Sequence, residues 1–286
     1  MRHIFTIYHP IVLLVYLASA IACAMATLQP AYVFISVLLG GVYARYLVGR
    51  KRFWTSFAAF LLLFAVVAVA NPLFNHKGLT VVFELFGNPV TLEAAAYGLC
   101  AGGLLLSVLL WFLCYQKLMT NEKFLYLFGR MLPTLSLMLS MILKLIPQCA
   151  YKVQNIRHAQ AGLLGGEGGG RREQLRQAVR TASILTSWTM EDSIETADSM
   201  RARGYGTAKR TAYSPFRFAV HDGLALAALG ALLAVHLVFL LRGGGYAFYP
   251  RLGPLDAVPL GAYAAYAALL AFPLILEAKE RWSWRR

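Results

Sequence analysis

Long apolar runs separated by short polar connections dominate the chain. Six runs have the length needed to cross a bilayer, which is about 18 or more residues with almost no charge. They cover residues 11–29, 31–48, 53–71, 93–115, 216–241 and 260–277. The apolar positions do not alternate with period two, so helices rather than a closed barrel are indicated. The pattern predicts an all-α integral membrane protein with about six transmembrane helices.

Residues 116–215 differ from the rest because they are too apolar for a linker and too charged to lie wholly in a membrane. Within them, 124–148 is strongly apolar but is interrupted by cations and prolines (Arg130, Pro133, Lys144 and Pro147). We expect a helix along the cytoplasmic face of the membrane, with a seventh span as the alternative. The glycines at 165–170 then predict a flexible joint between two helices.

A second cytoplasmic helix is predicted over 173–203, which contains neither proline nor glycine. At about 100° per residue its apolar and charged side chains separate onto opposite faces. The apolar face holds Leu175, Ala178, Val179, Ala182, Leu185, Met190, Ala197 and Met200, and the charged face holds Glu173, Arg176, Arg180, Glu191, Glu195 and Asp198. Arg201 and Arg203 fall in its last turn and Gly204 follows, as is typical of a helix end.

The composition supports this organisation. Hydrophobic residues make up 59% of the chain and charged residues 14%, with a net charge of +14. If the N-terminus is cytoplasmic, 24 of the 27 Lys and Arg fall on the inner side, as the positive-inside rule requires. We therefore expect four transmembrane helices in 1–115, cytoplasmic coupling helices in 116–215, and two transmembrane helices and a basic tail in 216–286. Both termini are then cytoplasmic.

Three separated segments carry a family resemblance. They are "WTMEDSIETADSMRARGYG" followed by "KRTAYSPFRF", then "NPLFNHKG" with "GNPVTLEAAAYG", and "FLYLFGRMLPTLSLMLSMILKLIP". In this order they resemble the transmembrane T component of energy-coupling factor (ECF) transporters, the EcfT/CbiQ family, over roughly residues 45–277. The resemblance implies a non-catalytic scaffold without cofactor in a bacterial cell membrane, belonging to an importer of vitamins or metal ions.

The resemblance also implies partners and contact residues. Two coupling helices of such a scaffold each end in a short Ala-Arg-Gly-like motif that docks on one of two ATP-binding subunits, and the scaffold also holds a substrate-binding S component. The second motif matches Ala202-Arg203-Gly204, next to Arg201. The first falls near 156–164, where Ala159 and Gln160 match but Leu163 replaces the arginine, so Arg157 is the candidate substitute. Methionines 119, 131, 138 and 141 are candidates for an adaptable S-component surface, or for core and lipid contacts.

Other functions remain to be weighed. From spacing alone, Arg203 and Gly204 are also explained by ordinary helix capping. A membrane enzyme would use His158, Glu191 and Glu195 at a cytoplasmic pocket, and a self-contained permease would need ionisable residues within its spans, where this chain has few. The six histidines show no metal-ligand spacing, His236 fits a helix contact inside a span, and the four cysteines fit small buried side chains better than a disulfide or metal site.

Overall fold

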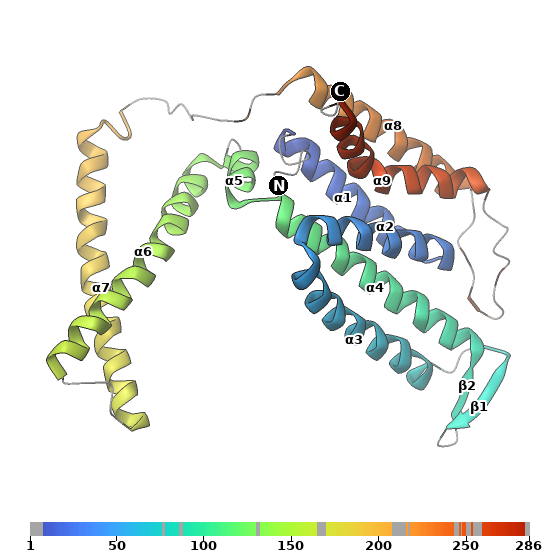
Figure 1. The fold of residues 1–286 in the computed structure, drawn as a ribbon, viewed down its shortest axis with the longest axis horizontal. Helices are drawn as coiled ribbons and strands as arrows, with labels where there is room; N and C mark the ends of the chain where they lie inside the picture. The colour runs from blue at the N-terminus through green and yellow to red at the C-terminus, as the bar shows by residue number, and fades with distance from the viewer. Residues whose placement is uncertain are drawn as a thin grey trace. The chain divides into compact units, whose positions relative to one another are not determined.

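The computed structural model describes residues 8–75, 78–85, 88–129, 132–164, 170–207, 216, 218–242, 246, 248–249, 253 and 259–283. The chain divides into two compact units, which Figure 1 shows with their elements. We call the unit formed by Met1–Phe124 and Phe216–Arg286 the bundle, and the unit Leu125–Pro215 the arm.

Six helices form the bundle: α1 (Pro10–Ala26), α2 (Pro30–Val48), α3 (Arg50–Phe74), α4 (Leu92–Leu118), α8 (Val220–Arg242) and α9 (Leu260–Ser283). Local sequence explains their limits. Pro10 and Pro30 occupy first helical positions, where a missing N–H removes no intrahelical bond. The Thr91 hydroxyl accepts from the N–H of Ala94 and caps α4, and Gly49, at φ +86°, separates α2 from α3.

Six helices of the described chain are long and apolar enough to cross a membrane, so the predicted number is confirmed. Their identity differs in one case. Helix α1 has 17 residues, or about 25 Å at 1.5 Å per residue, which is the lower limit for a span. Residues Pro133–Leu163 qualify instead by length and composition, the assignment that the sequence left open.

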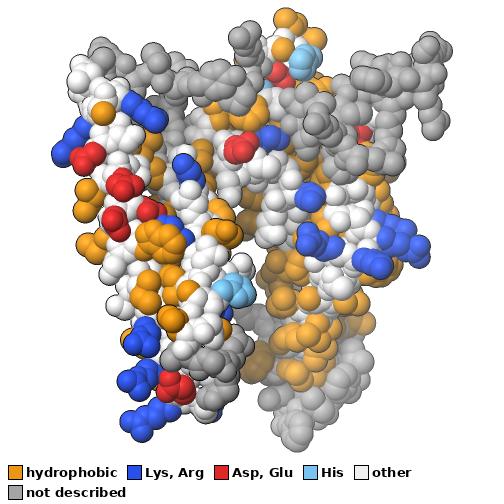
Figure 2. Space-filling view, turned by 60° about the vertical axis from the view of Figure 1, so that its left-hand side comes forward, with side chains coloured by type: hydrophobic (Ala, Val, Ile, Leu, Met, Phe, Trp, Pro, Cys, Tyr) orange, Lys and Arg blue, Asp and Glu red, His pale blue; other side chains and the backbone are white. Residues whose placement is uncertain are grey.

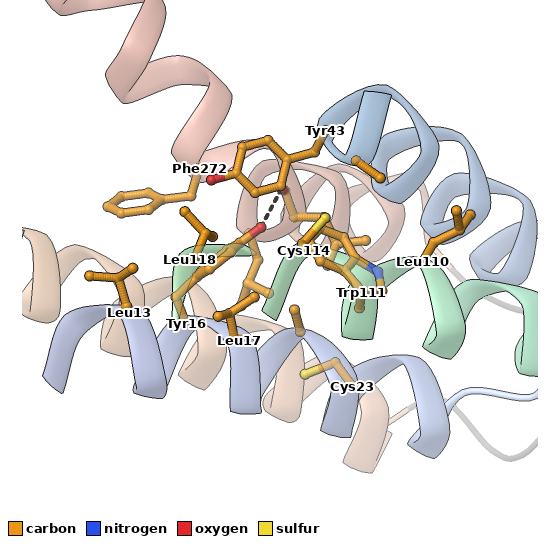
Figure 3. Packing of buried hydrophobic residues seen from close by; sticks show 14 of the residues in the cluster. Leu13, Tyr16, Leu17, Cys23, Tyr43, Leu110, Trp111, Cys114, Leu118 and Phe272 are labelled. Carbon is orange, nitrogen blue, oxygen red and sulfur yellow. Dashed lines mark hydrogen bonds between the residues drawn. The ribbon is translucent and has the colours of Figure 1, made fainter. Parts of the chain in front are cut away.

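The centre of the bundle is α4, which packs against α1, α2 and α3, while α9 packs on α2 and α8. Figure 3 shows the aromatic core around Trp111, which is fully buried. The Trp111 indole donates to the Ser36 hydroxyl (3.1 Å), which is also bonded to the Ser107 hydroxyl. The Tyr16 hydroxyl donates to the Leu270 carbonyl (2.9 Å), so the polar tips of both rings have partners inside the apolar core.

Small residues let α3 and α4 approach closely. A Cβ atom at Gly98 would lie 2.9 Å from the Ala68 carbonyl oxygen, and one at Gly102 would lie 3.0 Å from the Phe64 carbonyl oxygen. Such short approaches of backbone to backbone are typical of helix pairs within membranes, where packing rather than water exclusion drives association.

A polar clamp joins the N-terminal ends of α1 and α8. The carboxylate of Asp222 accepts from the N–H of His9 (3.0 Å) and from the N–H of Ala219 (3.0 Å), and the residue is 2% exposed. The His9 ring in turn accepts from the N–H of Ile11 through Nδ1 (3.3 Å) and caps α1. Burial lowers the pKa of His9, and the Asp222 carboxylate partly offsets this.

The connection between α3 and α4 is folded, as expected, but as a hairpin. Strand β1 (Val81–Leu85) pairs antiparallel with β2 (Asn88–Thr91), with an irregularity between Val81 and Phe83. Thr80 donates to the Glu93 carboxylate through both its N–H (3.3 Å) and its hydroxyl (2.5 Å). Glu93 thus ties the loop to the first turn of α4.

The arm consists mainly of α6 (Pro133–Leu164) and α7 (Arg171–Ala202), and the short α5 (Asn121–Gly129) crosses the boundary between the units. The apolar segment expected as one helix over 124–148 is therefore divided, because α5 ends at Gly129 and α6 begins at Pro133. Helix α7 agrees with the prediction of 173–203 to within two residues. Of the predicted glycine joint, residues 165–169 lie outside the described residues.

Candidate functional site

Helices α6 and α7 form a crossed antiparallel pair (Figure 1). Nearer the turn between them, the Thr181 hydroxyl donates to Oε1 of Gln160 (3.1 Å). Further from it, Lys152 forms an ion pair with Asp192, and its Nζ lies 4.4 Å from the centroid of the Trp188 ring. The helices are thus held at two positions by polar contacts.

The C-terminal end of α7 is a complete Schellman turn. The N–H of Tyr205 donates to the Met200 carbonyl (3.0 Å), and the N–H of Gly204 donates to the Arg201 carbonyl (2.9 Å). Gly204 has φ +78°, the left-handed conformation that this turn needs and that glycine adopts without strain. The predicted stop at Gly204 is confirmed, and Arg203 is the C-cap residue.

The side chains at this end point outward. Arg201, Ala202 and Arg203 are all exposed. Arg201 lies 4.0 Å from Asp198 in an exposed pair, which contributes little. In the described part of the chain no salt bridge involves Arg203, so its planar set of donors faces solvent. The end of α7 can therefore present a guanidinium to a carboxylate or to backbone carbonyls of another protein.

The end of α6 is built differently. Arg157 and Ala159 are exposed, and Leu163 is 86% exposed. Gln160 instead faces α7, with Oε1 bonded to Thr181 and with Nε2 buried and lacking a hydrogen-bond partner in the described part of the arm. Among the predicted residues of the first motif, the structure leaves Arg157 and Ala159 accessible and uses Gln160 to hold the helix pair.

The two ends are well separated within the arm. Gln160 contacts Thr181, and Arg203 lies 22 residues further along α7. This separation corresponds to about 33 Å at 1.5 Å per residue. One protein groove therefore cannot hold both ends at once.

A comparison with protein families matches residues 8–213 to CbiQ, described as cobalt transport protein. The chain belongs to the CbiQ cobalt transport protein family. A comparison with curated proteins gave no match. The matched range contains α1 to α7, and α8 and α9 follow it. With its six long apolar helices, this CbiQ-family chain is a multi-pass membrane protein and a component of a transporter.

The CbiQ arm leaves much of its apolar surface uncovered, as Figure 2 shows for one face. Leu175, Val179 and Met190 were predicted on the apolar face of α7, and each is at least 64% exposed. Helix α7 packs on α6 through another side, where Thr181 is 6% exposed. Most of the predicted apolar face is therefore exposed among the described residues of the arm, whereas Leu185 and Met200 are half-buried.

Of the four methionines predicted as an adaptable surface, two lie on α6 and are exposed, Met138 at 54% and Met141 at 37%. Met119 is buried, so that part of the prediction fits core packing. Met131 lies outside the described residues.

In the described part of the chain, the residues of the alternative enzyme site do not line the groove between α6 and α7. His158, Glu191 and Glu195 are all exposed. The described groove between α6 and α7 is lined by other side chains, namely Pro147, Gln148, Tyr151, Lys152 and Asp192. In the described part of the chain no group of His, Cys, Asp and Glu could hold a metal ion.

Some polar residues behave differently from the sequence prediction. His236 is a helix contact, stacked on Tyr266 at 5.0 Å and edge-on to Tyr32 at 5.8 Å, but neither ring nitrogen has a hydrogen-bond partner among the residues that the structure describes. Asp222 lies 3.7 Å from His221, as a salt link would. Its larger role as the clamp on α1 was missed, although an acid in the first turn of a helix is a known capping signal.

Proposed function

We propose that the chain is the T component of an ECF-type importer, a non-catalytic coupling subunit in the cell membrane. It would join two ATP-binding subunits to a substrate-binding S component. The observation that carries the proposal is the exposed Arg203 at the tip of α7, fixed by the Schellman turn on a helix of 32 residues. The positions of Lys and Arg favour cytoplasmic termini and a cytoplasmic arm.

The contact with an ATP-binding subunit follows from the chemistry of the tip. Ala202 and Gly204 are small and permit close approach of a groove, and Arg203 supplies planar donors for carboxylates or carbonyls. The left-handed Gly204 turns the chain away from the axis of α7, so the residues directly after it do not extend the helix toward the partner. The end of α6, with exposed Arg157, is the second contact.

Transmission follows from the crossed pair. A helix of 32 residues is about 48 Å long and carries a displacement of its tip along its length. The ion pair between Lys152 and Asp192 and the bond between Thr181 and Gln160 hold α6 and α7 at two positions. Movement of the two ATP-binding subunits at the tips would therefore move α6 and α7 together, as one unit.

The S component would cover the exposed apolar side chains of the arm. Met190 on α7 and Met138 on α6 are suited to this, because a methionine-rich surface adapts to different partners. The substrate would be selected by the S component. A cobalt ion fits the family description, and vitamins are the other class that the resemblance implies.

The experiment is charge reversal at the two ends. We expect Arg203→Glu to abolish copurification of at least one ATP-binding subunit and substrate uptake, and Arg203→Lys to retain part of both. Arg157→Glu should have the smaller effect if the α6 end is the weaker contact. Arg176→Glu, an exposed arginine on the same helix, is the matched control for assembly in detergent.

Two outcomes would contradict the proposal or a part of it. Normal copurification and uptake in Arg203→Glu would remove the assigned docking role. Equal loss in Arg203→Glu and Arg157→Glu would retain docking but refute the asymmetry between the two ends.

A further inference from the structure

The first three turns of α7 carry a concentration of positive charge that the coupling role does not use. Within ten residues the helix has four exposed arginines and two large exposed apolar side chains, Leu175 at 66% and Val179 at 64%. We call Arg171, Arg172, Arg176, Arg180, Leu175 and Val179 the basic-apolar face. Glu173 is the single acid in the same stretch.

The basic-apolar face has no role in holding the arm together. Helix α7 contacts α6 through Thr181, and at 100° per residue Arg176 lies about 140° and Val179 about 160° around the axis from Thr181. In the described part of the chain no salt bridge involves these arginines. They also do not stabilise the helix, because cations are unfavourable in the first turn, near the positive end of the macrodipole, and like charges four residues apart repel.

We infer that the basic-apolar face binds anionic phospholipid headgroups at the cytoplasmic surface of the bilayer. Arg172, Arg176 and Arg180 are four residues apart and follow one side of α7, so their guanidinium groups can each pair with lipid phosphate. Leu175 and Val179 lie beside this row and would enter the boundary between headgroups and acyl chains.

Charge complementarity favours anionic phospholipid as the ligand of the basic-apolar face. The positive-inside distribution assigns the arm to the cytoplasmic side, where anionic lipids give the leaflet a negative surface potential. Clusters of arginine interleaved with aliphatic side chains on one helix are typical of interfacial lipid binding. An acidic protein surface is the competing occupant, and the test separates the two.

The test uses the full chain in vesicles, with Cys149→Ser removing the one described cysteine that is not buried. A fluorophore on Val179→Cys reports contact with lipid through quenching by brominated acyl chains. The same fluorophore on Glu195→Cys, an exposed position in the acidic half of α7, is the matched control. Vesicles contain brominated phosphatidylcholine either alone or with phosphatidylglycerol.

We expect quenching at position 179 in vesicles with phosphatidylglycerol, and much less at position 195. Each surface arginine contributes about a fivefold factor to binding an anionic membrane, so Arg172→Gln, Arg176→Gln and Arg180→Gln together should shift the equilibrium about a hundredfold. High salt should also weaken binding of the basic-apolar face to the vesicle.

Three results would overturn the inference. They are absence of quenching in every vesicle, equal quenching in phosphatidylcholine alone, and unchanged quenching in the triple variant. If the fluorophore becomes shielded only when ATP-binding subunits are added, the face is a protein interface instead. The assay needs no ATP-binding subunit, and copurification by the triple variant is measured separately, so this inference and the proposed T-component role can fail independently.

Discussion

The sharpest test of the α7 tip is substitution of Gly204. Its φ of +78° is required by the Schellman turn, and the two turn bonds reach the carbonyls of Met200 and Arg201. A residue that avoids the left-handed region must open these bonds and release the last turn that orients Arg203. The substitutions Gly204→Asn, Gly204→Ala and Gly204→Val form a series of increasing conflict, since asparagine tolerates this region and β-branched residues do not.

The magnitude follows from the backbone. A left-handed conformation costs an L-residue roughly 1–2 kcal/mol relative to the right-handed one. That difference changes a local equilibrium by a factor of about 5–30. Among the described residues, a Cβ atom at Gly204 would meet only the Thr207 hydroxyl, at 3.2 Å. Backbone conformation rather than steric contact therefore dominates the expected effect.

Amide hydrogen exchange at Tyr205 measures the turn directly, because its N–H donates to Met200. We expect exchange about 5–30-fold faster in Gly204→Ala, faster still in Gly204→Val, and close to wild type in Gly204→Asn. Copurification of ATP-binding subunits should fall in the same order. If Gly204→Val exchanges and assembles like the wild type, the turn does not position Arg203.

Three further predictions concern packing and pH. Gly98→Ala should lower the thermal midpoint in detergent, since overpacking costs about 1–3 kcal/mol, whereas Gly230→Ala, with open space around it, should leave it unchanged or raise it. Lys152→Asp and Asp192→Lys should each lower the protease resistance of the arm. The double variant with the two charges exchanged should recover part of it, with a coupling free energy of about 1 kcal/mol. Burial lowers the pKa of His9, so folding favours the neutral imidazole. The contribution of His9 to the free energy of unfolding should therefore be complete above about pH 6.5 and lost as pH falls below it. The free energy of unfolding should depend less on pH in His9→Asn.

Helix positions were predictable because they depend on local signals. The absence of Gly and Pro over 173–203 and the Arg-Gly end gave α7 almost to the residue. The transmembrane helices followed from length and apolarity in the same way. The sequence did not decide whether α6 lies along the cytoplasmic face or spans the membrane, because Pro133–Leu163 is apolar in its first half and polar in its second.

The contacts within the arm could not be predicted, because they depend on distant partners. The apolar stripe of α7 could pack on α6 or on another subunit, and α6 contacts the side that holds Thr181. The reason lies in α6, where Gln160 and Lys152 require polar partners and find them in Thr181 and Asp192. Likewise, the joint role of His9 and Asp222 depends on contact between positions 213 residues apart, which no local pattern encodes.

The arm itself indicates that it functions in contact with other molecules. Among the described residues of the arm, only Ile156 and Thr181 are buried. A helix pair with so little buried surface gains little stability from its own packing, and helices in water depend on such packing. The exposed side chains include both apolar residues and arginines, so neither water nor the interior of a bilayer suits the whole surface. An arm with exposed arginines near the ends of its helices, an apolar side and a basic-apolar face would be stable where proteins and lipid headgroups cover each surface with matching chemistry.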